Sequence, residues 1–210
     1  MEKAIETITF QDGATLGIFY DQDPEDPRSW NDITKFFAMH RRNNWGDKHS
    51  YKESDFDGWT EFKATLEEDF NIAFISPVYA HEHSGVAFST GDFGDKWDSG
   101  CIGFIFITKE EAAKYHGEHG QEKREMTQEE AEAIFTGELE IYGEWCNGAV
   151  YGYVFTPPPL ATPHCETCSC KAEGEEEDSC WGFYGLDPKT NGMADNLPTK
   201  YRDELKTQRS

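Results

Sequence analysis

Acidic side chains outnumber basic ones by 41 to 19 in this chain of 210 residues, which gives a formal net charge of −22. An acidic chain that also lacked large apolar side chains would stay disordered, because it could not bury a core. Here 37% of the residues are hydrophobic and 14% are aromatic, which is enough for a folded domain. Such a fold must spread its carboxylates over most of its surface, where their mutual repulsion costs stability. This field repels DNA, RNA and anionic membranes and attracts basic surfaces.

The sequence shows no membrane or export segment. No apolar run approaches the roughly 18 residues of a membrane span, and the first ten residues lack the basic and then apolar pattern of a secretory signal. We therefore expect an intracellular protein that does not contact membranes and whose thiols are reduced.

Two dipeptides, Asp12-Gly13 and Asn147-Gly148, are typical of the two-residue turns of β-hairpins. The residues around each are β-branched or aromatic, as in strands, and similar runs lie in the middle of the chain. The expected strands are Glu6–Phe10, Ala14–Tyr20, Asn71–Tyr79, Val86–Thr90, Ile102–Ile107, Leu139–Cys146 and Ala149–Phe155.

Helices are indicated where a capping residue precedes apolar residues at helical spacing. The expected helices run from Ser54 to Phe70, Thr108 to Gly117 and Thr127 to Phe135, with shorter candidates at Ile33–His40 and Thr199–Lys206. These elements predict an α+β fold with a mixed or antiparallel sheet, β-hairpins, three to four helices and a Cys-rich loop appendage near the C-terminus. We expect an acidic α+β domain over residues 1–156, on which a Pro-, Cys- and Glu-rich appendage and tail (residues 157–210) packs.

Four of the six cysteines lie between residues 165 and 180, directly after His164. In a reducing compartment such clustering favours metal binding over disulfides. The pair Cys165 and Cys168, with two residues between them, places two thiolates on one side of a tight loop, as tetrahedral zinc requires. We predict one structural zinc ion held by Cys165, Cys168, Cys170 and Cys180, with His164 as a substitute ligand. Free thiols are the alternative, because the second pair of this spacing found in most zinc motifs is missing.

A second candidate site combines histidine with aspartate. His81 and His83 alternate along an expected strand, so both rings lie on one face, an arrangement that metal enzymes use. The following glycine-rich loop contains Asp92, Asp95 and Asp98, although this spacing does not fit a calcium loop and is more typical of a solvated connection. A metal-dependent hydrolase of a nucleotide-like substrate would use His81, His83, Asp98 and Asp21 as catalytic residues. No phosphate-binding loop, nucleophile elbow or zinc-protease helix is present, so the sequence favours a protein without catalytic activity.

The third candidate is a run of glutamates. Between Lys109 and Glu140 there are ten glutamates and four basic residues. Carboxylates aligned along helices approximate the charge array of DNA, which carries one negative charge about every 1.7 Å along its axis. We expect this segment to bind a basic, nucleic-acid-binding host protein and not nucleic acid itself, although a glutamate-rich face is equally typical of an ordinary soluble helix. The expected partner-binding residues are Glu110, Glu111, Glu118, Glu122, Glu125, Glu129, Glu130 and Glu132.

Several strings, in order, cover most of the chain. They are Pro27-Arg28-Ser29-Trp30-Asn31, Asn44-Trp45-Gly46-Asp47, His83-Ser84-Gly85 with Ser89-Thr90, Trp97-Asp98-Ser99-Gly100 with Gly103, Asn147-Gly148 with Tyr151-Gly152-Tyr153, and Asp178-Ser179-Cys180-Trp181-Gly182-Phe183-Tyr184-Gly185. Together they resemble a family of uncharacterised proteins encoded by tailed bacteriophages and prophages, which has no assigned activity and therefore contributes no catalytic residue.

The resemblance implies an accessory phage protein that works in the cytoplasm of a bacterial host. Small acidic phage proteins often resemble anti-defence factors, which mimic DNA to block restriction or CRISPR enzymes. We therefore expect an acidic inhibitor of a host nucleic-acid-binding or defence protein. A structural or assembly role in the virion is a further alternative to the hydrolase.

Overall fold

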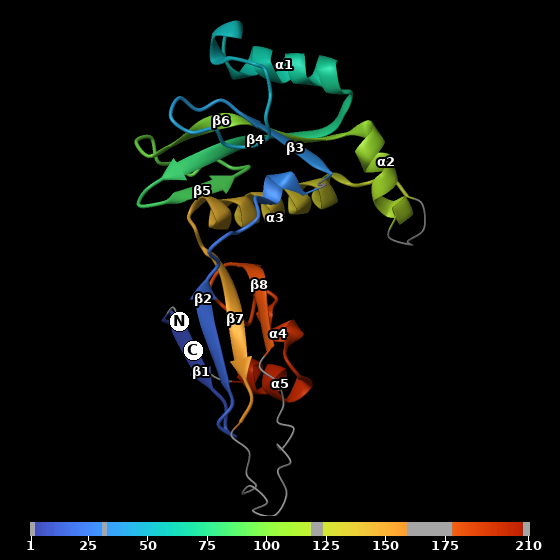
Figure 1. Cartoon of the computed structure of the whole chain (residues 1–210). Coiled ribbons are helices and arrows are strands. Elements are labelled where there is room, and N and C mark those ends of the chain that lie inside the picture. The colour runs from blue at the N-terminus through green and yellow to red at the C-terminus, as the bar shows by residue number, and fades with distance from the viewer. Residues whose placement is uncertain (1–2, 31–32, 119–123, 159–177, 208–210) are drawn as a thin grey trace, which may run out of the picture. The chain divides into compact units, whose positions relative to one another are not determined.

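The computed structural model describes residues 3–30, 33–118, 124–158 and 178–207, and it divides the chain into two compact units (Figure 1). The terminal unit combines Met1–Glu25 with Gly148–Ser210, and the central unit is Asp26–Asn147. Each contains one antiparallel four-stranded sheet, so the fold is α+β as expected. The division differs from the expected boundary after residue 156, because a strand that ends there pairs with strands from both ends of the chain.

The sheet of the terminal unit has the strand order β1-β2-β7-β8. The predicted hairpin forms around Asp12-Gly13, but its turn has three residues and not two, because the Phe10 amide donates to the Ala14 carbonyl at 2.9 Å. The Asp12 carboxylate accepts a hydrogen bond from the Ala14 amide, and Gly13 adopts a φ of 90° that favours glycine. The elements of this unit are β1 (Glu6–Thr9), β2 (Thr15–Tyr20), β7 (Val150–Thr156), β8 (Asp178–Tyr184), α4 (Met193–Asn196) and α5 (Thr199–Thr207).

Alternate residues of β2 and β7 build the core of the terminal unit against α4 and α5. Ile18 and Tyr153 are buried with Met193 and Leu205 in one apolar cluster. On β8, the Trp181 ring covers Gly152 so closely that a Cβ atom there would lie 2.0 Å from it. Residues 178–184, which we expected to be part of a loop appendage, are therefore a strand of the main sheet.

The central unit has its sheet in the order β3-β6-β4-β5, with α1 on one face and α3 on the other (Figure 1). Phe104 and Phe106 of β6 pack with Phe62 of α1, whereas Ile105 and Ile107 pack with Phe135 of α3. The unit is thus a three-layer sandwich. Its elements are η1 (Pro27–Ser29), β3 (Thr34–Ala38), η2 (Glu53–Asp55), α1 (Trp59–Phe70), β4 (Ile72–Glu82), β5 (Val86–Ser89), β6 (Ser99–Thr108), α2 (Lys109–Glu118) and α3 (Gln128–Cys146).

The predicted helix at Ile33–His40 is wrong, because residues 34–38 form β3 and pair with β6. Phe36 contributes to the core on the α3 side and Phe37 to the core on the α1 side. A strand that is buried on both faces carries a continuous apolar run, which cannot be told from a short helix by periodicity alone.

The predicted hairpin at Asn147-Gly148 is also wrong. Helix α3 continues through Cys146, and it buries Leu139 and Tyr142 at helical spacing. Asn147 lies at its C-cap, and Gly148 follows with a φ of 69°. An Asn-Gly pair can therefore end a helix, since glycine tolerates the left-handed conformation that stops helix growth.

The helix predicted to end at Phe135 continues to Cys146, so the predicted strand Leu139–Cys146 is wrong. The other predicted helices and strands agree with the structure within about five residues. Thr127 and Glu130 form the predicted capping box of α3, and the Thr108 hydroxyl accepts from the Glu111 amide at the start of α2. Helix α1 begins at Trp59, four residues after a separate 3-10 turn ends. None of the helices in the described ranges combines the length and the apolarity needed to cross a bilayer.

Candidate functional site

Three of the glutamates expected to bind a partner are paired with neighbouring cations. The Lys114 ammonium lies 2.9 Å from Glu110 and 3.1 Å from Glu111, and Arg124 pairs with Glu130. The hydrogen bond from Arg124, followed by that from the Thr127 amide, lowers the pKa of Glu130 to about 2. These three carboxylates therefore add less free negative charge than their number suggests.

The other five divide into two groups. Glu122 and the side chain of Glu118 lie outside what the structure describes. Glu125, Glu129 and Glu132 are exposed, and no cation of the described part of the chain forms an ion pair with them. Three of the eight glutamates expected to bind a partner, namely Glu125, Glu129 and Glu132, are therefore exposed and form no ion pair with a described residue.

Helix α3 concentrates this charge. Its 19 residues include six glutamates and no lysine or arginine. Glu140 is exposed and lies on the same outward side as Glu129, opposite the buried Phe135 and Leu139. Glu144 is half-buried, and desolvation followed by the charge of Glu140 raises its pKa.

A second acidic surface covers the outer side of α1 and the segment before it. Sequence reasoning missed this surface, although the signal was present: residues 53–69 contain seven acidic residues and one lysine. All seven are exposed, namely Glu53, Asp55, Asp57, Glu61, Glu67, Glu68 and Asp69. The helices α1 and α3 cover opposite faces of the central sheet (Figure 1). Both outer layers of this unit therefore present carboxylates.

The histidine–aspartate cluster lies where β4 ends and the β5–β6 loop returns. His81 Nε2 is 3.6 Å from Asp95 Oδ2, and His83 Nδ1 is 3.1 Å from Asp98 Oδ2. The structure therefore brings together three of the four residues proposed for a hydrolase, with Asp95 in addition. The fourth, Asp21, follows β2 in the terminal unit.

Backbone contacts fix the two aspartates of this cluster. Asp95 Oδ1 accepts a hydrogen bond from the Trp97 amide at 2.9 Å, which leaves Oδ2 directed at His81. The Glu82 amide donates to the Asp98 carbonyl at 2.8 Å and ties the loop to β4. The bonds from Trp97 and Asp98, and after them His81, lower the pKa of Asp95, so this carboxylate is ionised at neutral pH.

The predicted zinc ligands Cys165, Cys168 and Cys170, with His164, lie outside the described residues. Cys180 is half-buried on β8, where it pairs with Tyr153 of β7. The zinc site therefore stays a prediction.

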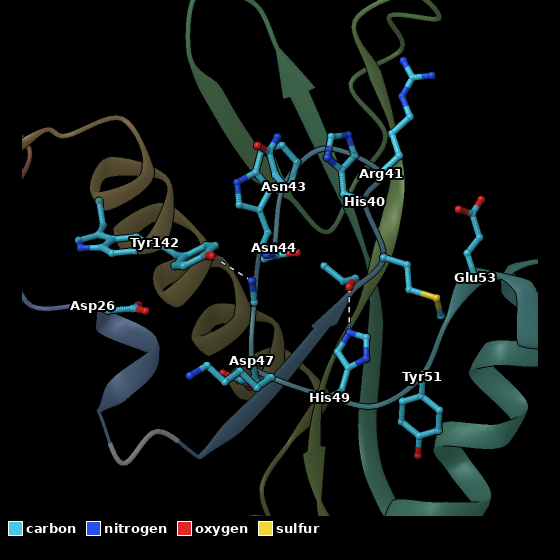
Figure 2. Close-up of a pocket in the computed structure, with 16 residues that line it drawn as sticks. Asp26, His40, Arg41, Asn43, Asn44, Asp47, His49, Tyr51, Glu53 and Tyr142 are labelled. Carbon is cyan, nitrogen blue, oxygen red and sulfur yellow. Dashed lines mark hydrogen bonds between the residues drawn. The ribbon is translucent and has the colours of Figure 1, made fainter.

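A cavity of about 510 Å³ in the central unit was not anticipated from the sequence (Figure 2). It is lined mainly by the segment that connects β3 to η2. His40 stacks on Trp45 with ring centroids 4.6 Å apart, and His49 donates from Nε2 to the Ala38 carbonyl at 2.9 Å. The Nδ1 atoms of these two histidines are buried and have no hydrogen-bond partner among the described residues.

Arg28 connects η1, β3, the β3–η2 segment and α3, and its partner Asp47 lines the cavity. Its side chain is only 6% exposed, and it forms a two-pronged contact with Asp47 at 3.0 and 2.9 Å. It also donates to Glu138 at 2.7 Å, and Asp47 and Glu138 together raise its pKa against the effect of burial. The Gly46 amide donates to the Tyr142 hydroxyl nearby. We interpret these polar groups as the contacts that hold the segment on the sheet.

Comparison with known proteins adds no relative: no family model, no curated protein and no solved structure matches the chain.

Proposed function

We propose that the central unit binds a basic surface on a nucleic-acid-binding protein and so keeps nucleic acid from it. The observation that carries this proposal is the composition of α3, in which six glutamates occur without a single basic residue. Exposed carboxylates attract a basic surface over long distances and speed association.

The charge density of the helix limits what it can imitate. Nineteen residues of α-helix extend over about 28 Å. Glu130 and Glu138 are paired with Arg124 and Arg28, and Glu144 is half-buried. The exposed Glu129, Glu132 and Glu140 therefore supply one open charge about every 9 Å. This is about a fifth of the density of duplex DNA, which has one charge about every 1.7 Å. The helix therefore resembles a sparse row of phosphates, and the exposed acids of α1 present a second row on the opposite face.

The resemblance to phage-encoded proteins supports a bacterial partner, such as a restriction or CRISPR enzyme that loses access to DNA when the acidic chain occupies its groove. Paired Glu110, Glu111 and Glu130 are less available for this contact than Glu129, Glu132 and Glu140. We assign the contact to the second group.

The test is capture from bacterial lysate at about 0.1 M and about 0.5 M salt, between which the screening length falls by about half. We expect DNA- or RNA-binding proteins to be recovered at low salt and lost at high salt. DNA added in excess should also displace them, because it competes for the same groove. Recovery of no nucleic-acid-binding protein at either salt would contradict the proposal.

Two matched variants separate a specific face from overall charge. Glu129→Gln/Glu132→Gln/Glu140→Gln removes three charges from α3, and Glu61→Gln/Glu67→Gln/Glu68→Gln removes three from α1. We expect only the α3 variant to lose the partner by tenfold or more. Equal losses in both would show that the net charge acts and that α3 has no special role.

A further inference from the structure

The cluster at the end of β4 brings together two types of metal-binding donor. His81 and His83 supply imidazole nitrogens, and Asp95 and Asp98 supply carboxylate oxygens. Donor atoms of His81, Asp95 and Asp98 all lie within 4.8 Å of one another. The four side chains come from two segments that pair in the sheet, since His81 is opposite Ser99 in the register of β4 and β6.

The distances within the cluster fit shared coordination. A first-row metal ion binds imidazole nitrogen and carboxylate oxygen at about 2.0–2.2 Å, so two of its ligand atoms lie about 3.0–3.6 Å apart. The separations of 3.6 Å between His81 and Asp95 and 3.1 Å between His83 and Asp98 fall within this range. Small movements of side chains would therefore place one ion among His81, Asp95 and Asp98, and the exposed His83 would turn towards it to add a fourth donor.

The residues around the histidine–aspartate cluster favour a bound metal ion. Asp95 directs one oxygen to backbone amides and the other towards His81, as carboxylate ligands commonly do when a second contact orients them. The Phe93 ring packs against His81 with centroids 5.4 Å apart and restricts that imidazole. His83 is the most open of the four, with 71% of its side chain exposed, so the site faces solvent on that side.

We propose that His81, His83, Asp95 and Asp98 bind one divalent first-row transition-metal ion such as Zn²⁺ or Mn²⁺. Imidazole suits these ions, whereas Mg²⁺ and Ca²⁺ prefer ligand sets made only of oxygen. The competing interpretation is two separate histidine–aspartate pairs that hold the loop to the strand without metal.

Titration with Co²⁺ alone, into chelator-treated and reduced full-length protein, separates these interpretations. We expect visible absorption typical of nitrogen and oxygen ligands, and paramagnetic shifts of NMR signals that are largest for the rings of His81 and His83. Cobalt bound by the cysteine segment would instead produce a thiolate-to-cobalt charge-transfer band, which identifies that site separately.

The variant Asp95→Asn/Asp98→Asn removes two ligands but keeps an Oδ1 acceptor for the loop amides, so it should fold. We expect it to weaken Co²⁺ binding at this cluster by about tenfold or more. His81→Gln is the second variant and should weaken binding likewise. Glu67→Gln/Glu68→Gln is the control, since it removes the same charge from α1, and it should bind as the unchanged chain does.

Three results would overturn the proposal. One is the absence of paramagnetic shifts at His81 and His83 when Co²⁺ is present in excess. Another is equal affinity of the cluster variants and the unchanged chain. The third is equal weakening by the α1 control, which would show a diffuse attraction of cations to a chain of net charge −22.

Discussion

Replacing Arg28 by methionine is the most direct test of how the central unit is held together. The methionine keeps an apolar stem in the same space but removes the guanidinium. Asp47 and Glu138 are only 22% and 18% exposed, and both would lose the guanidinium that contacts their carboxylates. Thr34 would also lose the hydrogen bonds that the guanidinium donates to its hydroxyl and carbonyl.

Removing one partner of a buried ion pair costs about 3–5 kcal/mol, because the remaining charge stays desolvated. Since the two carboxylates retain some contact with water, we expect the lower end, about 3 kcal/mol. That is more than a hundredfold in the equilibrium between folded and unfolded forms. The triple variant Arg28→Met/Asp47→Asn/Glu138→Gln should recover at least half of the loss, because no uncompensated charge remains.

Native-state hydrogen exchange measures the loss of stability of the central unit separately from the terminal unit. The amides of Phe36 and Phe37 on β3 report the central unit, and those of Ile18 on β2 and Tyr153 on β7 report the terminal unit. We expect exchange to accelerate for the first pair in Arg28→Met. A loss below about 1 kcal/mol, or a triple variant as unstable as the single one, would refute this account of the network.

Three further predictions concern single side chains. Asn147→Ala removes bonds of 2.8 Å to the amide and carbonyl of Val86 and to the Gly143 carbonyl, and should cost about 1–3 kcal/mol in urea denaturation. Asn147→Asp keeps the acceptor for the Val86 amide but cannot donate to the two carbonyls and places a negative charge beside them, so it should cost at least as much. An aspartate variant as stable as the unchanged chain would contradict the role of the amide. Because the pKa of Glu130 falls from 4.5 to about 2 on folding, its contribution to stability is complete above pH 4.5 and is lost as the pH falls towards 2. Glu130→Gln should therefore weaken the dependence of Tm on pH between pH 4.5 and about 2 in thermal denaturation. An unchanged dependence would contradict the role of this carboxylate in the capping box. Burial raises the pKa of Cys146 to about 11. Alkylation of this thiol at neutral pH, followed by mass spectrometry, should therefore be far slower in the native chain than in denaturant. Similar rates in the two conditions would show that the thiol is accessible.

The features that the sequence determined by itself are local ones. The hairpin around Asp12-Gly13 and the capping box at Thr127 and Glu130 formed as predicted, because all the groups involved lie within four residues of one another. Only the length of the turn differs, with three residues and not two. The strands β4 and β6 were also predictable, since their apolar and β-branched residues favour extended backbone whatever surrounds them. Open carboxylates at Glu125, Glu129 and Glu132 follow from the charge of the chain.

Tertiary structure decided the elements whose local signals are ambiguous. The apolar run around Phe36 forms a strand because α1 and α3 bury its opposite faces. No residue near Phe36 in the sequence indicates that a helix packs on each face. Asn147-Gly148 ends a helix and not a strand, because the burial of Leu139 and Tyr142 against the central sheet extends α3 to that point. The pairing of β2 with β7 likewise joins residues more than a hundred positions apart.

The histidine–aspartate cluster shows both contributions at one place. Alternation along a strand put His81 and His83 on one face from sequence alone. Which aspartates contact the histidines depends on how the strands pair. His81 lies opposite Ser99 in the register of β4 and β6, and this pairing brings Asp95 and Asp98 to the two rings. The sequence supplies the donors, but only the register of the strands selects which of them meet, because that register is fixed by burial on both faces of the sheet.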